Sequence, residues 1–291
     1  MVKIGFLVSG VNGYHLFKSL HQKCQVSFVC SYSQKGLFFD SLTPIRSICK
    51  SKKYTFGLRG VLNERVFEKA DYIFVAGWQY FLKNQLEKTV IFHDSLLPKY
   101  RGFSPTVNAL IQGETTIGVT AFKPKEKIDA GEIYAQAAQE IKYPIKIKEA
   151  MEVLGGCYMK TGLELLRKLE KKSLKGINQK ESLATYSIWR GEEDYKIDWS
   201  WAAPKIRRFV DALGWPYEGA KTMYDSIPLR VDEVEAIGDL HFVDRHPGKI
   251  WSSGNGFPEV ICGSGMIRIL KAHNADGKAV IFGKLRQKLG H

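Results

Sequence analysis

The stretch Met1-Val-Lys-Ile-Gly-Phe-Leu-Val8, continued by the turn Ser9-Gly-Val-Asn-Gly13, decides the fold of this chain. Residues 2–8 are nearly all apolar, which is typical of a strand covered on both faces. Residues 14–21 then show helical spacing of apolar side chains, and residues 25–31 form another apolar run. A strand, a turn, a helix and a second strand in this order predict a parallel sheet with Rossmann-like winding.

The alternation of strands and helices continues along the chain. The apolar patterns predict strands at 72–76, 90–93, 118–122 and 132–141. They predict helices at 63–69, 105–112 and 144–169. Residues 31–56 form a basic connection whose shape the pattern leaves open. This α/β pattern predicts an N-terminal domain of residues 1–198, linker included.

The pattern changes near residue 198, where we place a domain boundary. A short helix is predicted at 204–213, and segments with β character follow at 229–234, 248–251, 259–262 and 266–271. Glycine-rich turns separate these segments. This spacing predicts that residues 199–291 form a small, mostly β, OB-like module.

Composition excludes several classes of protein. With 44% hydrophobic and 25% charged residues, the chain resembles an ordinary soluble protein, and no apolar run approaches the roughly 20 residues of a membrane span. The cysteines are scattered and form no C-x-x-C pair, which is typical of reduced cytosolic thiols; they are Cys24, Cys30, Cys49, Cys157 and Cys262. We therefore expect a cytoplasmic protein without membrane insertion, disulfide frame or metal site.

The net charge of +13 is the one unusual feature of the composition. Clustered Lys and Arg side chains can neutralise the phosphates of a nucleic acid. They can also form a solvated surface with a site for a small anionic substrate. Much of the excess lies in residues 160–175, where basic residues accompany leucines along an amphipathic helix. We favour the solvated surface there, because charge runs usually form the wet face of a helix.

Two segments carry the residues suited to catalysis, His93-Asp-Ser-Leu-Leu-Pro-Lys-Tyr-Arg-Gly102 and Ile128-Asp-Ala-Gly131. A histidine at a strand-to-loop transition and an aspartate in a glycine-bounded loop form a pair suited to proton transfer and oxyanion stabilisation. Imidazole titrates near neutral pH. Pro98 fixes one φ angle and removes a donor, and Gly102 permits a conformation that other residues would resist, so residues 95–102 are expected to build the loop that holds His93.

With Phe103-Ser-Pro-Thr, Gly113-Glu and Gly118-Val-Thr-Ala between them, these segments resemble the formyltransferases that use N10-formyltetrahydrofolate. This group is the methionyl-tRNA formyltransferase-like superfamily. The resemblance implies that His93 binds the oxyanion and exchanges a proton, while Asp129 orients His93 and joins the proton relay. It implies N10-formyltetrahydrofolate as co-substrate and no metal.

The resemblance also implies a folate pocket. Residues 77–82, Gly-Trp-Gln-Tyr-Phe-Leu, stand where the family binds the pterin ring, largely through backbone groups. The residues implied are Tyr80, Phe81 and Leu82, with Lys125, Glu126 and Ile128 closing the pocket from the aspartate loop. The alternative for Trp78 and Phe81 is that they are aromatic residues of the core.

One position departs from the family pattern. These formyltransferases usually have an asparagine two residues before the histidine, where its amide helps to bind the formyl oxygen. Here that position is Ile91, whose side chain cannot donate a hydrogen bond. Either another group or a backbone N–H supplies the donor, or the enzyme is slow or altered.

The sequence after residue 186 resembles the linker and accessory domain of bacterial sugar N-formyltransferases and of methionyl-tRNA formyltransferases. The run Trp189-Arg-Gly-Glu-Glu-Asp-Tyr195 favours the sugar enzymes, which formylate the amine of a nucleotide-linked amino-deoxysugar, such as a dTDP-sugar, for surface polysaccharide or lipopolysaccharide. Trp189, Tyr186 or Tyr195 could stack a base, while Arg190 and Arg101 could meet the diphosphate. Arg101 could instead anchor its loop, and Trp189 could join the two domains.

Two other functions stay open. A methionyl-tRNA formyltransferase would explain the net charge and the basic residues 31–56, roughly where those enzymes carry a tRNA-gripping insertion. Against it, the start of the chain lacks the Gly-Thr-Pro turn common in that group. A non-catalytic folate- or nucleotide-binding protein would explain Ile91. The C-terminal module could form a homodimer or brace the catalytic domain.

Overall fold

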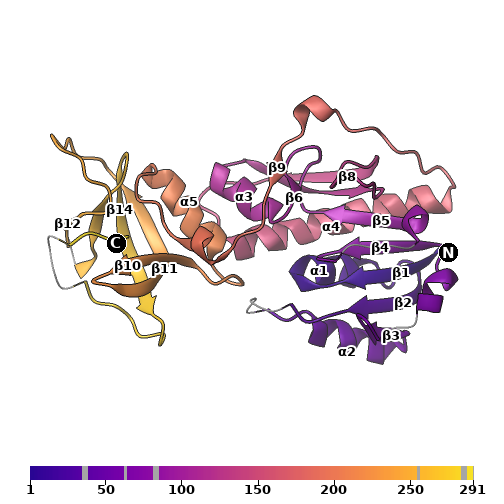
Figure 1. Ribbon diagram of the computed structural model, residues 1–291. Helices are drawn as coiled ribbons and strands as arrows, with labels where there is room; N and C mark the ends of the chain where they lie inside the picture. Colours follow the sequence, from indigo (N-terminus) through magenta and orange to yellow (C-terminus); the bar gives the residue numbers. More distant parts are fainter. Residues whose placement is uncertain (35–38, 62–63, 81–84, 254–255, 283–286, 291) are drawn as a thin grey trace. The chain divides into compact units, whose positions relative to one another are not determined.

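The computed structural model describes residues 1–34, 39–61, 64–80, 85–253, 256–282 and 287–290. The chain forms two compact units (Figure 1). Unit 1 comprises residues 1–106, 115–141 and 149–188, and unit 2 comprises residues 107–114, 142–148 and 189–291. Two short segments from the first half of the chain therefore belong to the unit that contains the C-terminal residues.

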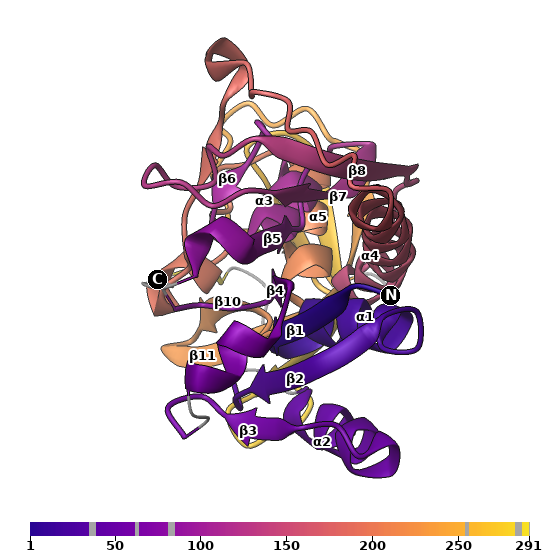
Figure 2. The ribbon, with the colours of Figure 1, turned by 90° about the vertical axis from the view of Figure 1, so that its right-hand side faces the viewer.

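Unit 1 is built on a seven-stranded sheet of order β3-β2-β1-β4-β5-β7-β8. The strands from β3 to β5 in this order are parallel, and β7 and β8 continue the sheet in antiparallel pairing. Figure 2 shows β2, β1, β4 and β5 side by side. The bounds are β1 Lys3–Val8, β2 Gln25–Ser31, β3 Phe56–Leu58, β4 Tyr72–Ala76, β5 Thr89–His93, β7 Thr116–Phe122 and β8 Ile133–Glu140.

Helices α1 (Gly10–Leu20) and α4 (Ile147–Glu170) contact one face of this sheet. Phe6 of β1 meets Phe17 of α1 with ring centroids 5.3 Å apart. Phe92 of β5 stacks on Tyr158 of α4 at 6.4 Å. Side chains alternate between the two faces of a strand, so Ile91 and His93 leave β5 on the opposite face from Phe92.

On that opposite face the core is a cluster of buried apolar side chains. Leu7, Phe28, Ile73 and Val75 belong to it, and Ile91 packs against it together with Val66, Phe67 and Trp78. The short 3-10 helix η1 (Glu64–Lys69) supplies Val66 and Phe67. The other elements with residues in unit 1 are α2 Leu42–Lys52, η2 Leu86–Lys88, β6 Arg101–Gly102, η3 Glu181–Leu183 and β9 Tyr186–Ser187, and α3 Pro105–Gln112 begins there.

Unit 2 contains a five-stranded antiparallel sheet of order β10-β11-β14-β13-β12. The amphipathic helix α5 (Ala203–Leu213) buries Ile206, Phe209 and Val210. The remaining elements are η4 Glu192–Tyr195, β10 Ala220–Tyr224, β11 Ile227–Ile237, β12 Ile250–Ser252, β13 Glu259–Ile261 and β14 Met266–Asn274. The predicted fold class, an α/β unit followed by a small, mostly β one, is confirmed.

Several elements differ from the sequence-based expectation. Helix α1 begins at Gly10, so most of the turn expected at residues 9–13 is its first turn. The connection at residues 31–56 contains helix α2. The helix expected at 63–69 is the 3-10 segment η1, and residue 63 lies outside the described residues. Strand β10 was not anticipated, because its central residues Lys221 and Thr222 interrupt the apolar pattern. The domain boundary near residue 198 stays a prediction.

Candidate active site

His93 is the last residue of β5 and lies at the carboxyl end of the parallel strands. Its Nε2 atom is 2.8 Å from the carbonyl oxygen of Tyr100. A carbonyl group only accepts hydrogen bonds, so this contact places a proton on Nε2. In the neutral imidazole, Nδ1 then carries the lone pair. The fold thus selects one tautomer and leaves Nδ1 as the basic atom.

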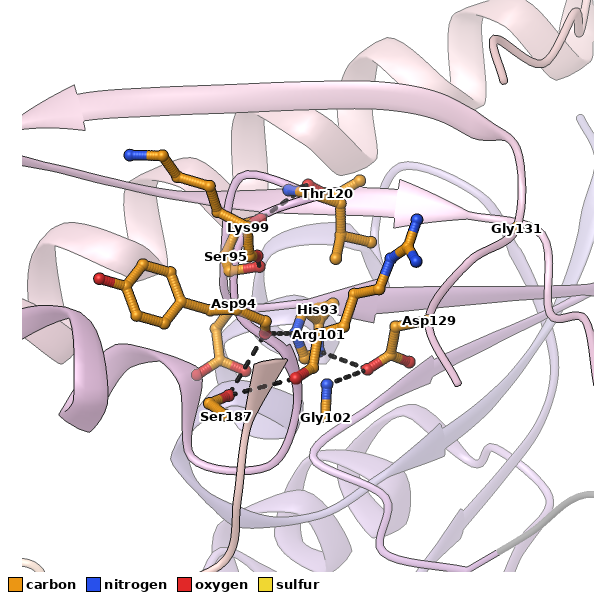
Figure 3. Close-up of polar contacts among 12 residues, drawn as sticks. His93, Asp94, Ser95, Lys99, Arg101, Gly102, Thr120, Asp129, Gly131 and Ser187 are labelled. Atoms are coloured by element: carbon orange, nitrogen blue, oxygen red, sulfur yellow. Dashed lines mark hydrogen bonds and ion pairs between the residues drawn. The ribbon is translucent and has the colours of Figure 1, made fainter. Parts of the chain in front are cut away.

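Asp129 lies opposite His93 (Figure 3), with its Oδ2 atom 3.7 Å from His93 Nδ1. The same oxygen accepts a 2.7 Å hydrogen bond from the backbone N–H of Gly102. The two side chains are 9% and 16% exposed, so little solvent separates them. The gap is too long for a direct hydrogen bond, but it suits an ion pair once Nδ1 takes up a proton.

The loop that connects β7 to β8 holds Asp129 in a left-handed backbone conformation, with φ +49°. Aspartate tolerates this conformation better than most residues. Gly131 allows the loop to close tightly, because a Cβ atom there would lie 1.5 Å from the carbonyl oxygen of Lys123. The N–H of Lys123 donates to the carbonyl of Glu132 at 3.0 Å.

Residues 94–102 form a loop that several hydrogen bonds fasten to β7. Thr120 Oγ1 donates to the carbonyl of Ser95 at 2.7 Å and accepts from the N–H of Leu97 at 3.1 Å. Ser95 Oγ donates to the carbonyl of Lys99 at 2.7 Å. The Leu97-Pro98 peptide bond is cis. These contacts fix the backbone that presents the Tyr100 carbonyl to His93.

The guanidinium of Arg101 is fully buried. It donates to Gln179 Oε1 from Nε and Nη2 at 3.1 and 2.9 Å, and from Nη1 to Glu181 at 2.9 Å and the Tyr186 hydroxyl at 3.2 Å. Glu181 also pairs with Lys127. The pKa of Glu181 is lowered mainly by its contact with Lys127 and, to a smaller extent, by its contact with Arg101. Of the two roles considered for Arg101, these contacts supply the anchor. Its contact with a phosphate stays a prediction.

The structure accounts for the departure at position 91. Ile91 lies on the same face of β5 as His93 and packs against the apolar cluster that contains Leu7 and Phe28. A side-chain amide at position 91 would pack with one edge against this apolar cluster. Burying an amide without partners costs roughly 1–3 kcal/mol. The isoleucine therefore contributes to the core of unit 1.

Four of the six residues implied for folate binding are described by the structure, and all four are exposed. Tyr80 is 41% exposed, and the Arg59 guanidinium lies over its ring at 3.3 Å. Lys125, Glu126 and Ile128 are exposed in the loop that contains Asp129. Phe81 and Leu82 lie outside the described residues. The folate-binding role of all six residues stays a prediction.

The residues implied for nucleotide binding in the linker belong to unit 2. The Trp189 side chain is 67% exposed. Arg190 donates from Nη2 to Asn108 Oδ1 at 2.7 Å, and burial lowers the pKa of its guanidinium. Tyr195 is half-buried, with Lys221 Nζ 5.6 Å from its ring centroid. The substrate-binding role of these three residues stays a prediction.

Sequence reasoning missed the segment that supports the site from residues 179–187. Gln179 contacts both Arg101 and the Asp129 loop. Thr185 accepts backbone hydrogen bonds from Tyr100 and Arg101 through Oγ1 and its carbonyl, each at 2.8 Å. These are ordinary polar residues in a segment without periodicity, so their sequence carries no signal of this role. Among the described residues, no group of three or more His, Cys, Asp or Glu side chains could hold a metal ion.

The chain matches two family models, described as formyl transferase over residues 53–153 and formyl transferase, C-terminal domain, over residues 191–284. Both His93 and Asp129 fall in the first region. The chain belongs to the formyltransferase superfamily. The family prediction made from the motifs at residues 93–102 and 128–131 is thereby confirmed.

A curated relative is the methionyl-tRNA formyltransferase of Caldanaerobacter subterraneus subsp. tengcongensis. It is 32% identical over 181 residues, which cover 62% of this chain and 57% of the relative. The chain thus spans less than two thirds of the length of the curated relatives it matches.

Two solved structures share the fold. An N-formyltransferase from Helicobacter canadensis, in complex with folinic acid and dTDP-3-aminofucose, has a TM-score of 0.66 at 14% identity, covering 92% of this chain and 99% of that one. HypX from Aquifex aeolicus, in complex with tetrahydrofolic acid, has a TM-score of 0.64 at 19% identity, covering 96% of this chain and 45% of that one. No helix in the described part of our chain is long and apolar enough to cross a membrane.

Proposed function

We propose that this protein transfers a formyl group from N10-formyltetrahydrofolate to the amine of a nucleotide-linked amino-deoxysugar. The observation that carries the proposal is the position of His93, with Nδ1 3.7 Å from Asp129 Oδ2 and Nε2 2.8 Å from the Tyr100 carbonyl oxygen. Membership of the formyltransferase superfamily supports the reaction. Two structures of the same fold hold tetrahydrofolic acid or folinic acid, which supports a folate donor.

The pair of side chains suits each step of this transfer. The lone pair of the acceptor amine attacks the formyl carbon, and His93 Nδ1 takes a proton from the amine. The protonated imidazole then pairs with Asp129 through Nδ1, and its positive charge stabilises the oxyanion of the tetrahedral intermediate. As the bond from the carbon to N10 breaks, the proton that His93 took from the amine passes to N10, and His93 Nδ1 regains its lone pair. The products are a formamide and tetrahydrofolate.

Two observations support a sugar nucleotide as the acceptor. The Helicobacter canadensis structure, which holds dTDP-3-aminofucose, matches this chain over nearly the whole length of both. The linker run from Trp189 to Tyr195 resembles that of the sugar enzymes, and it includes an exposed indole ring next in sequence to an arginine. An exposed indole can stack a nucleotide base.

Initiator tRNA is the second candidate acceptor. The curated relatives at about 30% identity are methionyl-tRNA formyltransferases. In addition, α2 and the residue after it expose Arg46, Lys50, Lys52 and Lys53. Such a basic surface is the electrostatic signature of a phosphate backbone partner.

A parallel acceptor assay distinguishes these candidates. The full chain is incubated with N10-formyltetrahydrofolate and either a panel of nucleotide-linked 3- and 4-amino-6-deoxysugars or methionyl initiator tRNA, and mass spectrometry follows the gain of a formyl group. We expect product from at least one sugar and none from tRNA. Product from tRNA alone would refute the proposed acceptor. Tight folate binding without product from any acceptor would show a non-catalytic binder.

Salt provides an independent arm of the assay. Binding to the phosphate backbone of tRNA releases counterions, so its affinity falls steeply, by about 10³ or more between 50 and 200 mM salt when several phosphates are contacted. A diphosphate-linked sugar makes far fewer phosphate contacts. We therefore expect the KM for the acceptor to change by less than about tenfold over this range.

A further inference from the structure

The side chain of Gln179 joins the two loops that carry the candidate active site. Its Oε1 atom accepts from Arg101 Nε and Nη2 at 3.1 and 2.9 Å. Its Nε2 atom donates to the carbonyl oxygens of Asp129 and Gly131, both at 2.7 Å. One amide thus bonds to the residue before Gly102 in the histidine loop and to both sides of Ala130 in the aspartate loop.

Chemistry fixes the orientation of this amide. A guanidinium only donates hydrogen bonds and a carbonyl only accepts them. The amide oxygen must therefore face Arg101, and the amide nitrogen must face the aspartate loop. Both donor positions and two acceptor positions of Gln179 are used, so a flipped amide would place like groups against like at four contacts.

The hydrogen bonds of Gln179 lie next to the hydrogen bond between Asp129 and Gly102. Asp129 Oδ2 accepts from the Gly102 N–H, and Gln179 ties the backbone of Asp129 to the side chain of Arg101. Two parallel connections therefore join the same pair of loops. Since Asp129 has a left-handed backbone, the extra tie at its carbonyl restrains the conformation that aims its carboxylate at His93.

We infer that Gln179 is a positioning residue for formyl transfer, which holds the Asp129 carboxylate opposite His93. This inference deepens the proposed function and rests on it for its catalytic consequence. Gln179 touches neither His93 nor the carboxylate itself, so it acts through the backbone of the aspartate loop. A displacement of about 1 Å in a catalytic group can cost on the order of a hundredfold in rate.

The competing explanation is that Gln179 only satisfies the buried charge of Arg101. The variant Gln179→Glu separates the two roles. A carboxylate accepts both hydrogen bonds from Arg101 and adds an ionic partner, but it offers no N–H to the carbonyls of Asp129 and Gly131. The anchor of Arg101 is therefore kept, while the tie to the aspartate loop is lost. Gln139→Glu, an exposed position on β8, is the matched control for the change in charge.

The Gly102 amide proton reports the position of Asp129 without any substrate. Because this N–H donates to Asp129 Oδ2, loosening the aspartate loop exposes it to exchange with solvent. Hydrogen–deuterium exchange at Gly102 is measured in the parent chain, Gln179→Glu and Gln139→Glu, beside kcat, KM for both substrates and the thermal unfolding midpoint. Gln179→Asn is the second variant, because its amide is one methylene shorter and cannot reach both loops.

In Gln179→Glu we expect exchange at Gly102 to accelerate at least about tenfold, and kcat to fall about thirty- to a hundredfold with KM changed less than threefold. The second carboxylate oxygen of Gln179→Glu faces two carbonyl oxygens, so the unfolding midpoint should also fall, whereas Gln139→Glu should match the parent throughout. Parent-like exchange and kcat in Gln179→Glu would overturn the inference. If that variant does not fold, Gln179→Asn must show the same two losses, and parent-like values there overturn it equally. If the parent transfers no formyl group, the proposed function fails, while the Gly102 exchange still decides the role of Gln179.

Discussion

His93 is oriented by a backbone carbonyl, whereas its carboxylate partner is oriented by a backbone N–H. The carbonyl belongs to Tyr100 and the N–H to Gly102, two residues further along the same loop. The loop that follows β5 therefore determines the tautomer of the base and the position of the acid together. This arrangement explains how two side chains distant in sequence can be placed with little help from other side chains.

The catalytic contribution of the negative charge on Asp129 can be tested without disturbing the loop. In Asp129→Asn the side-chain oxygen can still accept from Gly102, and asparagine tolerates φ +49° as well as aspartate does. The ion pair with protonated His93 is lost. We expect kcat to fall at least about a hundredfold, with the thermal unfolding midpoint nearly unchanged. A rate within threefold of the parent would remove Asp129 from the mechanism.

The sequence predicted His93 and Asp129 but not what holds them. The pair was accessible because the motifs around residues 93–102 and 128–131 preserve the family pattern. The groups that orient the pair are main-chain atoms, which any residue carries. The remaining support, Gln179, lies 50 residues beyond Asp129 in a segment without periodicity. Such contacts depend on the tertiary fold and leave no local pattern.

A substitution at Ile91 tests whether the missing side-chain donor limits the rate. In Ile91→Asn an amide would stand on the same face of β5 as His93, where the family usually has its oxyanion donor. We expect kcat to rise about tenfold, since the loss of one such donor costs about 10²–10³. We expect the free energy of unfolding to fall by about 1–3 kcal/mol, because the amide replaces an apolar side chain packed against the core cluster.

Ile91→Val is the control for packing, with an expected cost of about 1 kcal/mol and no change in kcat. Steady-state kinetics and chemical denaturation measure both variants. An Ile91→Asn enzyme that is folded but no faster than the parent would show that another group already supplies the donor.

Among the elements, helix α1 and the residue that caps its C-terminus carry a pH-dependent part of the stability. His15 lies against Gly155 of α4, where a Cβ atom on the glycine would lie 2.8 Å from His15 Nδ1. The pKa of His15 is lowered mainly by burial and, to a smaller extent, by the charge of Lys18. His21 is hydrogen-bonded to the Tyr54 hydroxyl. The pKa of His21 is lowered mainly by burial and, to a smaller extent, by the charge of Lys52. Below the usual value of 6.5, the unfolded chain therefore binds more protons than the folded one at both positions.

We accordingly expect the free energy of unfolding to be highest above pH 6.5 and to fall as the pH drops below it. His15→Gln and His21→Gln should each flatten this dependence, whereas His241→Gln, at an exposed position, should leave it unchanged. Urea denaturation at several pH values between about 5 and 8 measures the slope. A slope unaffected by either substitution on α1 would contradict this account.

Elements with strong patterns were predictable and those with weak ones were not. Strand β4 coincides with the predicted residues 72–76, because its residues are almost all apolar and lie between Asp71 and Gly77. The shape of the segment that contains helix α2 was left open, since Ile45 and Cys49 are the only buried residues of the helix and polar residues with Arg46, Lys50 and Lys52 interrupt its apolar pattern. Its helical period is thus carried by two positions, too few for a pattern to be recognised.

At the scale of the whole molecule, the two compact units do not follow the order of the chain. Residues 107–114 and 142–148 belong to unit 2, where Arg208 of α5 donates to the Ile111 carbonyl at 3.0 Å. The Tyr143 hydroxyl donates to the carbonyl of Glu114 at 2.9 Å, and Arg190 donates to Asn108 Oδ1 at 2.7 Å. A chain ended near residue 198 would keep both short segments but lose Arg208 and the helix that carries it.

We therefore expect a fragment of residues 1–198 to unfold at a lower temperature than the full chain, because the packing of both segments against the C-terminal residues is lost. Limited proteolysis should cut the fragment first within residues 107–114 or 142–148, which the full chain protects. Arg208→Met in the full chain keeps most of the apolar stem and removes the donors, so it should shift the midpoint in the same direction by a smaller amount. Lys205→Met on the same helix is the control for charge. A fragment that unfolds cooperatively at the midpoint of the full chain, with both segments protected, would show instead that residues 1–198 form an independent domain.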